Sequence, residues 1–99
     1  MEEKNNISIC AMVNYDVKVK TTGSAYCGTD FWGDSKFEDY RYEELRTISG
    51  FDLLAEFSEN LEELDMYDFS VKNNTYYFSF FTPTNGSYCD KTYTIMREI

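Results

Sequence analysis

The chain has 99 residues, of which 18 are acidic and 9 basic, and its formal net charge at pH 7 is −9. This length predicts one domain over residues 1–99, and a content of 42% apolar and 18% aromatic residues excludes a disordered acidic segment. The acidic excess argues against direct binding of nucleic acid, and no apolar run approaches the roughly 20 residues of a membrane span.

The three cysteines, Cys10, Cys27 and Cys89, are far apart in the sequence and form no C-x-x-C pair. The polar start of the chain does not fit a signal peptide, so we expect a cytoplasmic protein with three reduced thiols. A disulfide between Cys10 and Cys89 stays open as an alternative if the first and last strands are neighbours.

Residues 7–19 alternate between two sets of side chains, which predicts a strand with one face toward the core. The core-facing set consists of Ile7, Ile9, Ala11, Val13, Tyr15, Val17 and Val19. A straight strand of this length would span about 43 Å, which is longer than a compact domain of this size. We therefore expect a bend, bulge or turn near residues 14–16, so that the element is either one long curved strand or two shorter ones.

Residues 21–36 are rich in Thr, Gly, Ser and Asp, which predicts an irregular loop. The loop contains Tyr26, Phe31 and Trp32. Large rings in a loop either pin it to the core or contact a partner, and we favour pinning.

Residues 36–48 fit two structures. Ser35 and Glu38 match a helix capping box, whereas Tyr42 and the β-branched Thr47 suit a strand. We favour a short helix over 36–47, and a strand is the alternative.

Residues 50–65 give the clearest pattern, an amphipathic helix that begins with a capping box of Ser49 and Asp52. Its predicted core face consists of Leu53, Leu54, Phe57, Leu61 and Leu64. Its opposite face carries regularly spaced acids, namely Asp52, Glu56, Glu59 and Glu63, with Glu62 beside them. No Lys or Arg within this helix lies at helical pairing distance from these acids, so we expect them to be unpaired.

Residues 66–81 predict a β-hairpin that turns at Asn73-Asn74, because Asn tolerates a positive φ. This turn places three apolar pairs on one face: Val71 with Tyr76, Phe69 with Phe78, and Tyr67 with Phe80. Tyr77 and Phe81 then lie on the other face.

A loop over residues 82–87 leads to a last strand over 88–97 that directs Tyr93 and Ile95 to the core. The predicted fold class is therefore α+β. An antiparallel sheet of four to five strands packs on one amphipathic helix (50–65), with the short helix over 36–47 as a second option.

The sequence lacks the residues of several kinds of catalytic site. Without histidine there is no Ser–His or Cys–His nucleophile pair and no imidazole metal ligand. No Gly-rich loop meets a Lys at a helix start in the phosphate-binding pattern. We expect no enzyme activity, no cofactor and no bound metal.

The negative charge is concentrated in one part of the chain. Residues 30–68 hold thirteen acidic and three basic side chains, a net charge of −10, and the other sixty residues hold five acidic and six basic ones. Such a segment either keeps a protein soluble or binds a basic partner. Neighbouring positions on a helix face are about 5–6 Å apart, a spacing comparable with that of phosphates along a nucleic-acid strand. We favour the binding surface.

In size, acidity, Tyr content and charge layout, the chain resembles small phage-encoded inhibitors of bacterial defence, above all anti-CRISPR proteins, several of which mimic nucleic acid. The resemblance implies an inhibitor in the cytoplasm, that of the host cell if phage-encoded. It would bind a basic protein surface on a CRISPR effector or another nuclease, and neither nucleic acid nor a membrane. Immunity proteins that neutralise nuclease toxins share this profile, and a generic acidic interaction domain is a third alternative.

The residues expected to bind the partner are mostly acids of the helix and its surroundings. They are Asp52, Glu56, Glu59, Glu62, Glu63 and Asp65, flanked by Glu43 and Glu44. Tyr26, Phe31 and Trp32 would be aromatic anchors. In the generic alternative, the contacts would come from Tyr77 and Phe81.

Overall fold

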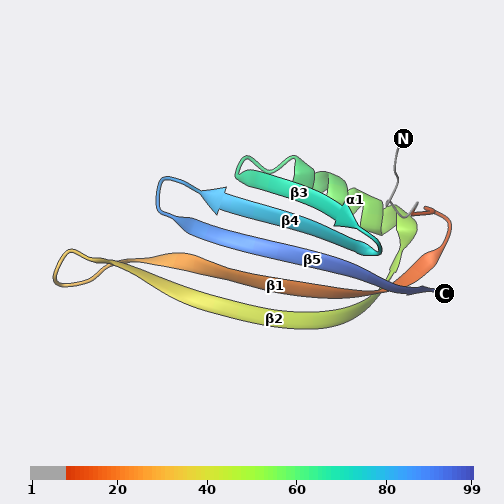
Figure 1. The fold of residues 1–99 in the computed structure, drawn as a ribbon, viewed down its shortest axis with the longest axis horizontal. Helices are drawn as coiled ribbons and strands as arrows, with labels where there is room; N and C mark the ends of the chain where they lie inside the picture. The colour runs from red at the N-terminus through yellow and green to blue at the C-terminus, as the bar shows by residue number, and fades with distance from the viewer. Residues whose placement is uncertain (1–8) are drawn as a thin grey trace.

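The computed structural model describes residues 9–99 and contains five strands and one helix (Figure 1). In chain order the elements are β1 (Asn14–Thr29), β2 (Ser35–Ser49), α1 (Gly50–Leu61), β3 (Met66–Lys72), β4 (Thr75–Thr82) and β5 (Ser87–Glu98). One antiparallel sheet with one helix confirms the predicted α+β class. Among the described residues, no helix has the length and apolar character needed to cross a membrane.

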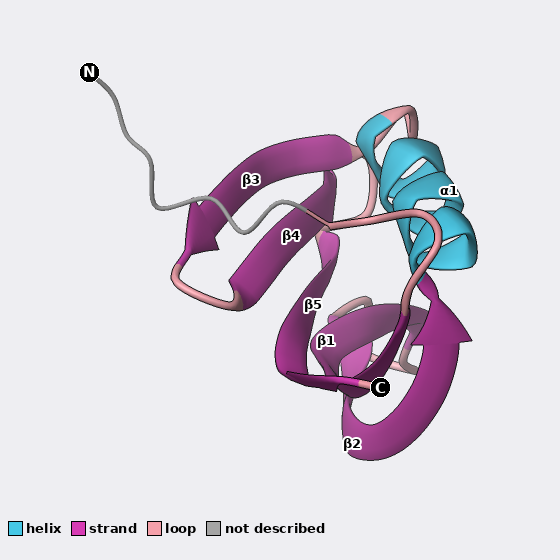
Figure 2. Ribbon diagram, turned by 90° about the vertical axis from the view of Figure 1, so that its right-hand side faces the viewer, coloured by secondary structure: helices cyan, strands magenta, loops and turns pink. Residues whose placement is uncertain are grey.

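The strands form a single sheet in the order β2-β1-β5-β4-β3, so β2 and β3 are its edges. α1 packs against one face of this sheet (Figure 2), and we call that face, together with α1, the helix side. The opposite face is the outer face, and within residues 9–99 no second layer covers it. Residues directly opposite each other on antiparallel strands share a face, so the strand register assigns each strand residue to one side.

The core lies between α1 and the sheet. Its buried members are Tyr15, Val17, Val19, Leu53, Phe57, Tyr76, Phe78, Phe80, Tyr93 and Ile95. Phe57 is central, because its ring centroid lies 4.7–5.2 Å from those of Tyr76, Phe78 and Tyr93. The predicted inward directions of Tyr93 and Ile95 are confirmed, as is the inward alternation of the first strand from residue 15 onward.

The first strand begins at Asn14, so the predicted strand over residues 7–19 is wrong for residues 9–13; residues 7 and 8 lie outside the described part. The bulge expected near residues 14–16 is confirmed by the register shift between Asp16 and Val17. The chain from residue 9 instead turns across the start of α1. There the carbonyls of Val13 and Ala11 accept hydrogen bonds, at 2.7 and 3.2 Å, from the first two helix amides. These amides have no partner inside the helix, so the turn satisfies them.

The predicted loop over 21–36 and the favoured helix over 36–47 are both wrong. Most of these residues belong to β1 and β2, which pair along their whole length with one register shift near Gly28. The strand alternative for residues 36–48 is therefore right.

Tertiary pairing explains why a segment rich in Thr, Gly and Ser forms a strand. Hydrogen bonds to β2 on one side and to β5 on the other hold the backbone of β1. At Gly23, an added Cβ would lie 2.5 Å from the hydroxyl oxygen of Tyr40. The Tyr40 ring from β2 therefore fills the space that a larger side chain at position 23 would take.

α1 begins where the sequence predicts and ends earlier. The Ser49 hydroxyl accepts a hydrogen bond from the Asp52 amide at 3.1 Å, which confirms the cap. The helix ends at Leu61 rather than at residue 65, and Leu64 is fully exposed beyond it (105%).

The core face of α1 is narrower than its periodicity predicts. Leu53 and Phe57 are buried, but Leu54 and Leu61 are exposed, so these two and Leu64 are wrong as core residues. The third buried side chain of the helix is the polar Asn60, which hydrogen-bonds to the sheet.

The β3–β4 hairpin follows the prediction near its turn, where Asn73 has a φ of 56°. The pairs Val71–Tyr76 and Phe69–Phe78 are confirmed. The pair of Tyr67 with Phe80 is wrong, because a register shift places Met66 opposite Phe80. Tyr67 instead contacts Phe81 on the outer face, with ring centroids 6.2 Å apart.

The molecule is elongated. Its extents are 53 × 30 × 19 Å and its radius of gyration is 16.1 Å, compared with about 13 Å for a compact domain of this length. α1 is about 18 Å long, so it covers only one end of the sheet. The β1–β2 hairpin extends past the β4–β5 turn and ends in a loop over residues 30–34 (Figure 1).

Candidate interaction surface

Charge separates the two sides of the sheet. The register places five acids and five bases on the outer face: Asp16, Asp39, Glu43, Asp68 and Asp90 with Lys18, Lys20, Arg41, Lys72 and Arg97. The helix side carries nine acids and three bases: Glu38, Glu44, Asp52, Glu56, Glu59, Glu62, Glu63, Asp65 and Glu98 with Lys36, Arg46 and Lys91. The outer face is therefore neutral, and the helix side has a net charge of −6.

Strand alternation thus divides the acidic segment found in the sequence. Glu43 lies on the outer face opposite Lys20, whereas its neighbour Glu44 lies on the helix side. The two were predicted to flank the helix acids together. The structure brings only Glu44 to that side.

Glu56 does not lie on the solvent face, where the periodicity placed it. The Arg46 guanidinium on β2 donates two hydrogen bonds to its carboxylate, at 2.8 and 2.9 Å. The Tyr93 hydroxyl donates a third at 2.7 Å and accepts one from the Asn60 amide at 3.2 Å. Glu56 therefore joins the helix to the sheet, and its expected roles as an unpaired acid and a partner-binding residue are not supported by this geometry.

The network shifts the pKa of each ionisable group in it. The hydrogen bonds from Arg46 hold the pKa of Glu56 below its usual value, and the same contact raises the pKa of Arg46. Burial, with the hydrogen bond to Glu56, raises the pKa of Tyr93. At neutral pH the pair is therefore fully charged and Tyr93 stays protonated.

Other helix acids lie on the same flank of α1 as Glu56. Asp52 and Glu59 are four residues before and three residues after it, and both are exposed. This flank faces β2, where Glu44 lies two residues before Arg46 on the same side of the strand. We call Glu44, Asp52 and Glu59 the acidic surface.

The remaining predicted acids follow the helix. Glu62 and Glu63 are exposed. Asp65 is half-buried, and its carboxylate accepts a hydrogen bond from the Thr82 hydroxyl at 3.3 Å. Beside them, Asn60, Glu63, Asp65, Phe80, Cys89 and Lys91 line a depression of about 250 Å³. These acids extend the acidic surface past the C-terminal end of α1.

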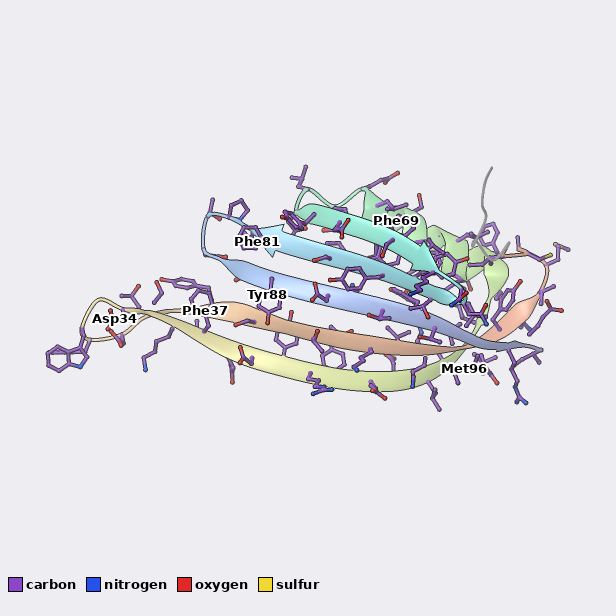
Figure 3. The ribbon with its side chains drawn as sticks, viewed as in Figure 1. Asp34, Phe37, Phe69, Phe81, Tyr88 and Met96 are labelled. Atoms are coloured by element: carbon purple, nitrogen blue, oxygen red, sulfur yellow. The ribbon has the colours of Figure 1, made fainter. Side chains whose placement is uncertain are left out.

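The loop at the hairpin tip presents two aromatic side chains. Phe31 and Trp32 are 91% and 81% exposed, and their rings meet edge to face at 5.2 Å. The expectation that they pin the loop to the core is wrong. Figure 3 shows the tip, with Asp34 labelled, at the far end of the molecule.

This tip loop has a defined conformation. The Asp30 carboxylate accepts hydrogen bonds from the Trp32 and Asp34 amides, both at 2.9 Å, and the Asp30 amide donates to the Asp34 carbonyl at 2.9 Å. Gly33 has a φ of 87°, which favours glycine. The two rings are thus held outward at low conformational cost.

Tyr26 is not an anchor of the same kind. Its ring packs edge to face on Phe37 at 5.8 Å, and its hydroxyl hydrogen-bonds with the Thr29 hydroxyl at 2.8 Å. Tyr42 is one of the exposed aromatic residues that sequence reasoning missed; it is 58% exposed and stacks on Tyr40. The alternation of these two tyrosines was the available signal, since it indicates a strand that turns both to one face.

No group of three or more potential metal ligands occurs among residues 9–99. All three cysteines are free, so the alternative of a Cys10–Cys89 disulfide is wrong. A hydrogen bond with the Cys89 thiol raises the pKa of the Tyr40 hydroxyl. Compared with known proteins, the chain matches no family model, no curated protein and no solved structure.

Proposed function

We propose that this chain is a protein inhibitor that binds the basic, nucleic-acid-binding surface of a bacterial defence nuclease. The observation that supports it is the separation of charge: the outer face is neutral, and the helix side, with the acidic surface, is strongly negative. Acids that serve only solubility have no need to gather on one side. The proposal includes the anti-CRISPR type of inhibitor that the sequence resembles.

The geometry supports a two-part contact. The acidic surface would occupy a groove lined by Lys and Arg, where long-range attraction speeds encounter. Phe31 and Trp32 at the tip would add the apolar contact that exposed, fixed aromatic rings provide in protein interfaces. The network around Glu56 takes no part in binding and keeps α1 on the sheet.

The test compares two double charge reversals that change the net charge equally. Glu44→Lys with Glu59→Lys alters the acidic surface, and Asp39→Lys with Asp68→Lys alters the outer face. Each variant is added to DNA cleavage assays with purified CRISPR effector complexes. We expect the wild type to inhibit one of them, the first variant to need at least about tenfold more protein, and the second to inhibit as the wild type does.

Circular dichroism must show that both variants keep the fold. Equal loss in both would attribute inhibition to net charge and overturn the location on the helix side. Unchanged inhibition by the first variant would exclude the acidic surface. Lack of inhibition of every effector, with inhibition of a nuclease toxin, would support the immunity-protein alternative, which uses the same surface.

One observation favours the generic interaction domain instead. On the outer face, Tyr67, Tyr77, Phe81 and Tyr88 border an open depression of about 310 Å³. Figure 3 labels Phe81 and Tyr88. A partner bound there would be held by apolar contact, so its affinity would change little between 50 and 200 mM salt. Binding to the acidic surface should weaken steeply over that range.

A further inference from the structure

The two edges of the sheet differ in how well they are protected against pairing with a strand of another chain. β3 is 7 residues long and has a register shift near Asp68, features that discourage pairing with another chain. β2 is 15 residues long and pairs with β1 without interruption from Phe37 to Ser49. Within residues 9–99, no strand pairs with the second edge of β2.

The side chains of β2 do not protect this edge either. Leu45 is 76% exposed and Tyr42 is 58% exposed. The strand contains no proline. Its three basic side chains are interspersed among its four acidic ones, so no block of like charge would repel a second copy.

We propose that β2 pairs antiparallel with β2 of a second copy of this chain, about a twofold axis at Tyr42. Tyr42 is the midpoint of Ser35–Ser49, so this register pairs the whole strand. Arg41 of each copy then lies opposite Glu43 of the other, on the outer face. No two like charges are opposed.

A second complementary pair occurs on the helix side of the same register. Glu38 of one copy lies opposite Arg46 of the other, at the rim of the existing contact between Arg46 and Glu56. Both pairs occur twice because of the symmetry. Direct cross-strand pairs of opposite charge stabilise a sheet, and like charges destabilise it.

Neighbouring registers are less favourable. If the axis moves by one residue to Arg41, Asp39 lies opposite Glu43 and Glu38 lies opposite Glu44, so like charges face each other. Moving it in the other direction, to Glu43, opposes that residue to itself. An axis at Tyr40 is also complementary, through Arg41 with Asp39, but it pairs only residues 35–45. Charge therefore leaves the axes at Tyr42 and Tyr40, and of these only the axis at Tyr42 pairs the whole strand.

The assembly would be a continuous ten-stranded sheet, since each copy contributes 5 strands. An antiparallel pair about this axis keeps corresponding faces together, so both copies of α1 lie on one side. This inference does not rest on the proposed function, because strand pairing uses the free backbone edge of β2, whereas the side chains of Glu44 and Glu59 project from the helix side.

The experiment measures the mass of the full chain in solution by light scattering and sedimentation equilibrium. We expect the wild type to form a dimer at micromolar concentration. Arg41→Glu and Glu43→Arg should each raise the dimer dissociation constant at least about tenfold, because each opposes like charges twice. An equimolar mixture of the two variants should form a heterodimer, because both of its cross-strand pairs are again opposite in charge.

Asp39→Arg is the matched control, since Asp39 lies opposite Leu45 in this register and its replacement should leave the dimer intact. The register about Tyr40 predicts the reverse: Asp39→Arg would dissociate the dimer and Glu43→Arg would not. That result would overturn the proposal. So would a wild type that stays monomeric at 100-fold above micromolar concentration, or a mixture of the two variants that does not associate. Thermal melts identify a variant that loses its fold, and rescue in the mixture tests pairing even if one variant is destabilised.

Discussion

The end of the sheet that α1 covers buries its aromatic side chains, whereas the end that forms the hairpin tip exposes them. At the covered end, Phe57 lies among three buried aromatic rings, and Glu56 ties the helix to the sheet through charged hydrogen bonds. At the tip, Phe31 and Trp32 are exposed although burial would stabilise the protein. The comparison indicates that buried contacts stabilise the covered end, whereas the exposed rings of the tip contribute little to stability.

The middle of the β1–β2 hairpin joins these two regions. Here the sheet has one layer, and its rings pack along the strands instead of across a core. Tyr40 lies over Gly23, and Tyr26 packs on Phe37. Pairing of an edge strand with a second copy would extend this single layer sideways, without adding a second one.

The largest expected effect comes from removing the central ring of the covered end. Phe57→Ala should lower the free energy of unfolding by about 3–5 kcal/mol, because it leaves a cavity among Tyr76, Phe78 and Tyr93. Urea denaturation followed by fluorescence measures this. Leu64→Ala is the control, since its side chain is fully exposed and should cost less than about 0.5 kcal/mol. Similar losses in the two variants would contradict the assigned core.

A smaller effect is expected from the contact between helix and sheet. Glu56→Gln should cost about 1.5–3 kcal/mol at pH 7, because it removes the charge from a carboxylate that accepts two bonds from Arg46 and one from Tyr93. Folding lowers the pKa of Glu56, so its contribution is fully present above the usual Glu pKa, about 4.3. It is lost as the pH falls through the lowered value.

The stability of the wild type and of Glu56→Gln should therefore begin to converge as the pH falls below the usual Glu pKa. The pKa of Asp16 is also lowered, by Thr47 and Arg97, but that carboxylate is present in both proteins and cancels in the comparison. Denaturation curves measured from pH 7 to pH 3 check this. A constant difference over the whole range would show that the charge of Glu56 contributes nothing to stability.

Local sequence patterns correctly predicted the structural features that are determined by residues close together in the chain. Alternation identified the inward face from Tyr15 onward, and Ser49 identified the start of α1, because each signal is contained in a few residues. Segments stabilised by distant partners were missed. In the sequence alone, Gly23 and its neighbours indicate a loop. They form a strand because the ring of Tyr40 packs over Gly23 and because β2 and β5 pair with both sides of β1.

The same limit applies to the candidate surface. The helical pairing rule considers residues three or four positions away, so it found no base for Glu56, whose partner Arg46 lies ten residues earlier on a strand. Glu43 and Glu44 are adjacent in the sequence, yet the pleat of β2 sends them to opposite faces. The acidic segment was visible in the sequence, and its division between faces required the register.

The smallest effect on stability, and the sharpest difference between the two ends, is expected at the tip. Phe31→Ala with Trp32→Ala should change the free energy of unfolding by less than about 0.5 kcal/mol, because both rings are exposed and contact mainly each other. If the tip is an anchor in the proposed inhibition, the same variant should inhibit at least about tenfold less well. Asp30 and Gly33 hold the turn without either ring, so the loop should keep its shape. A destabilised tip variant would show that the rings support the fold after all, and a stable variant with undiminished inhibition would leave the acidic surface as the whole of the contact.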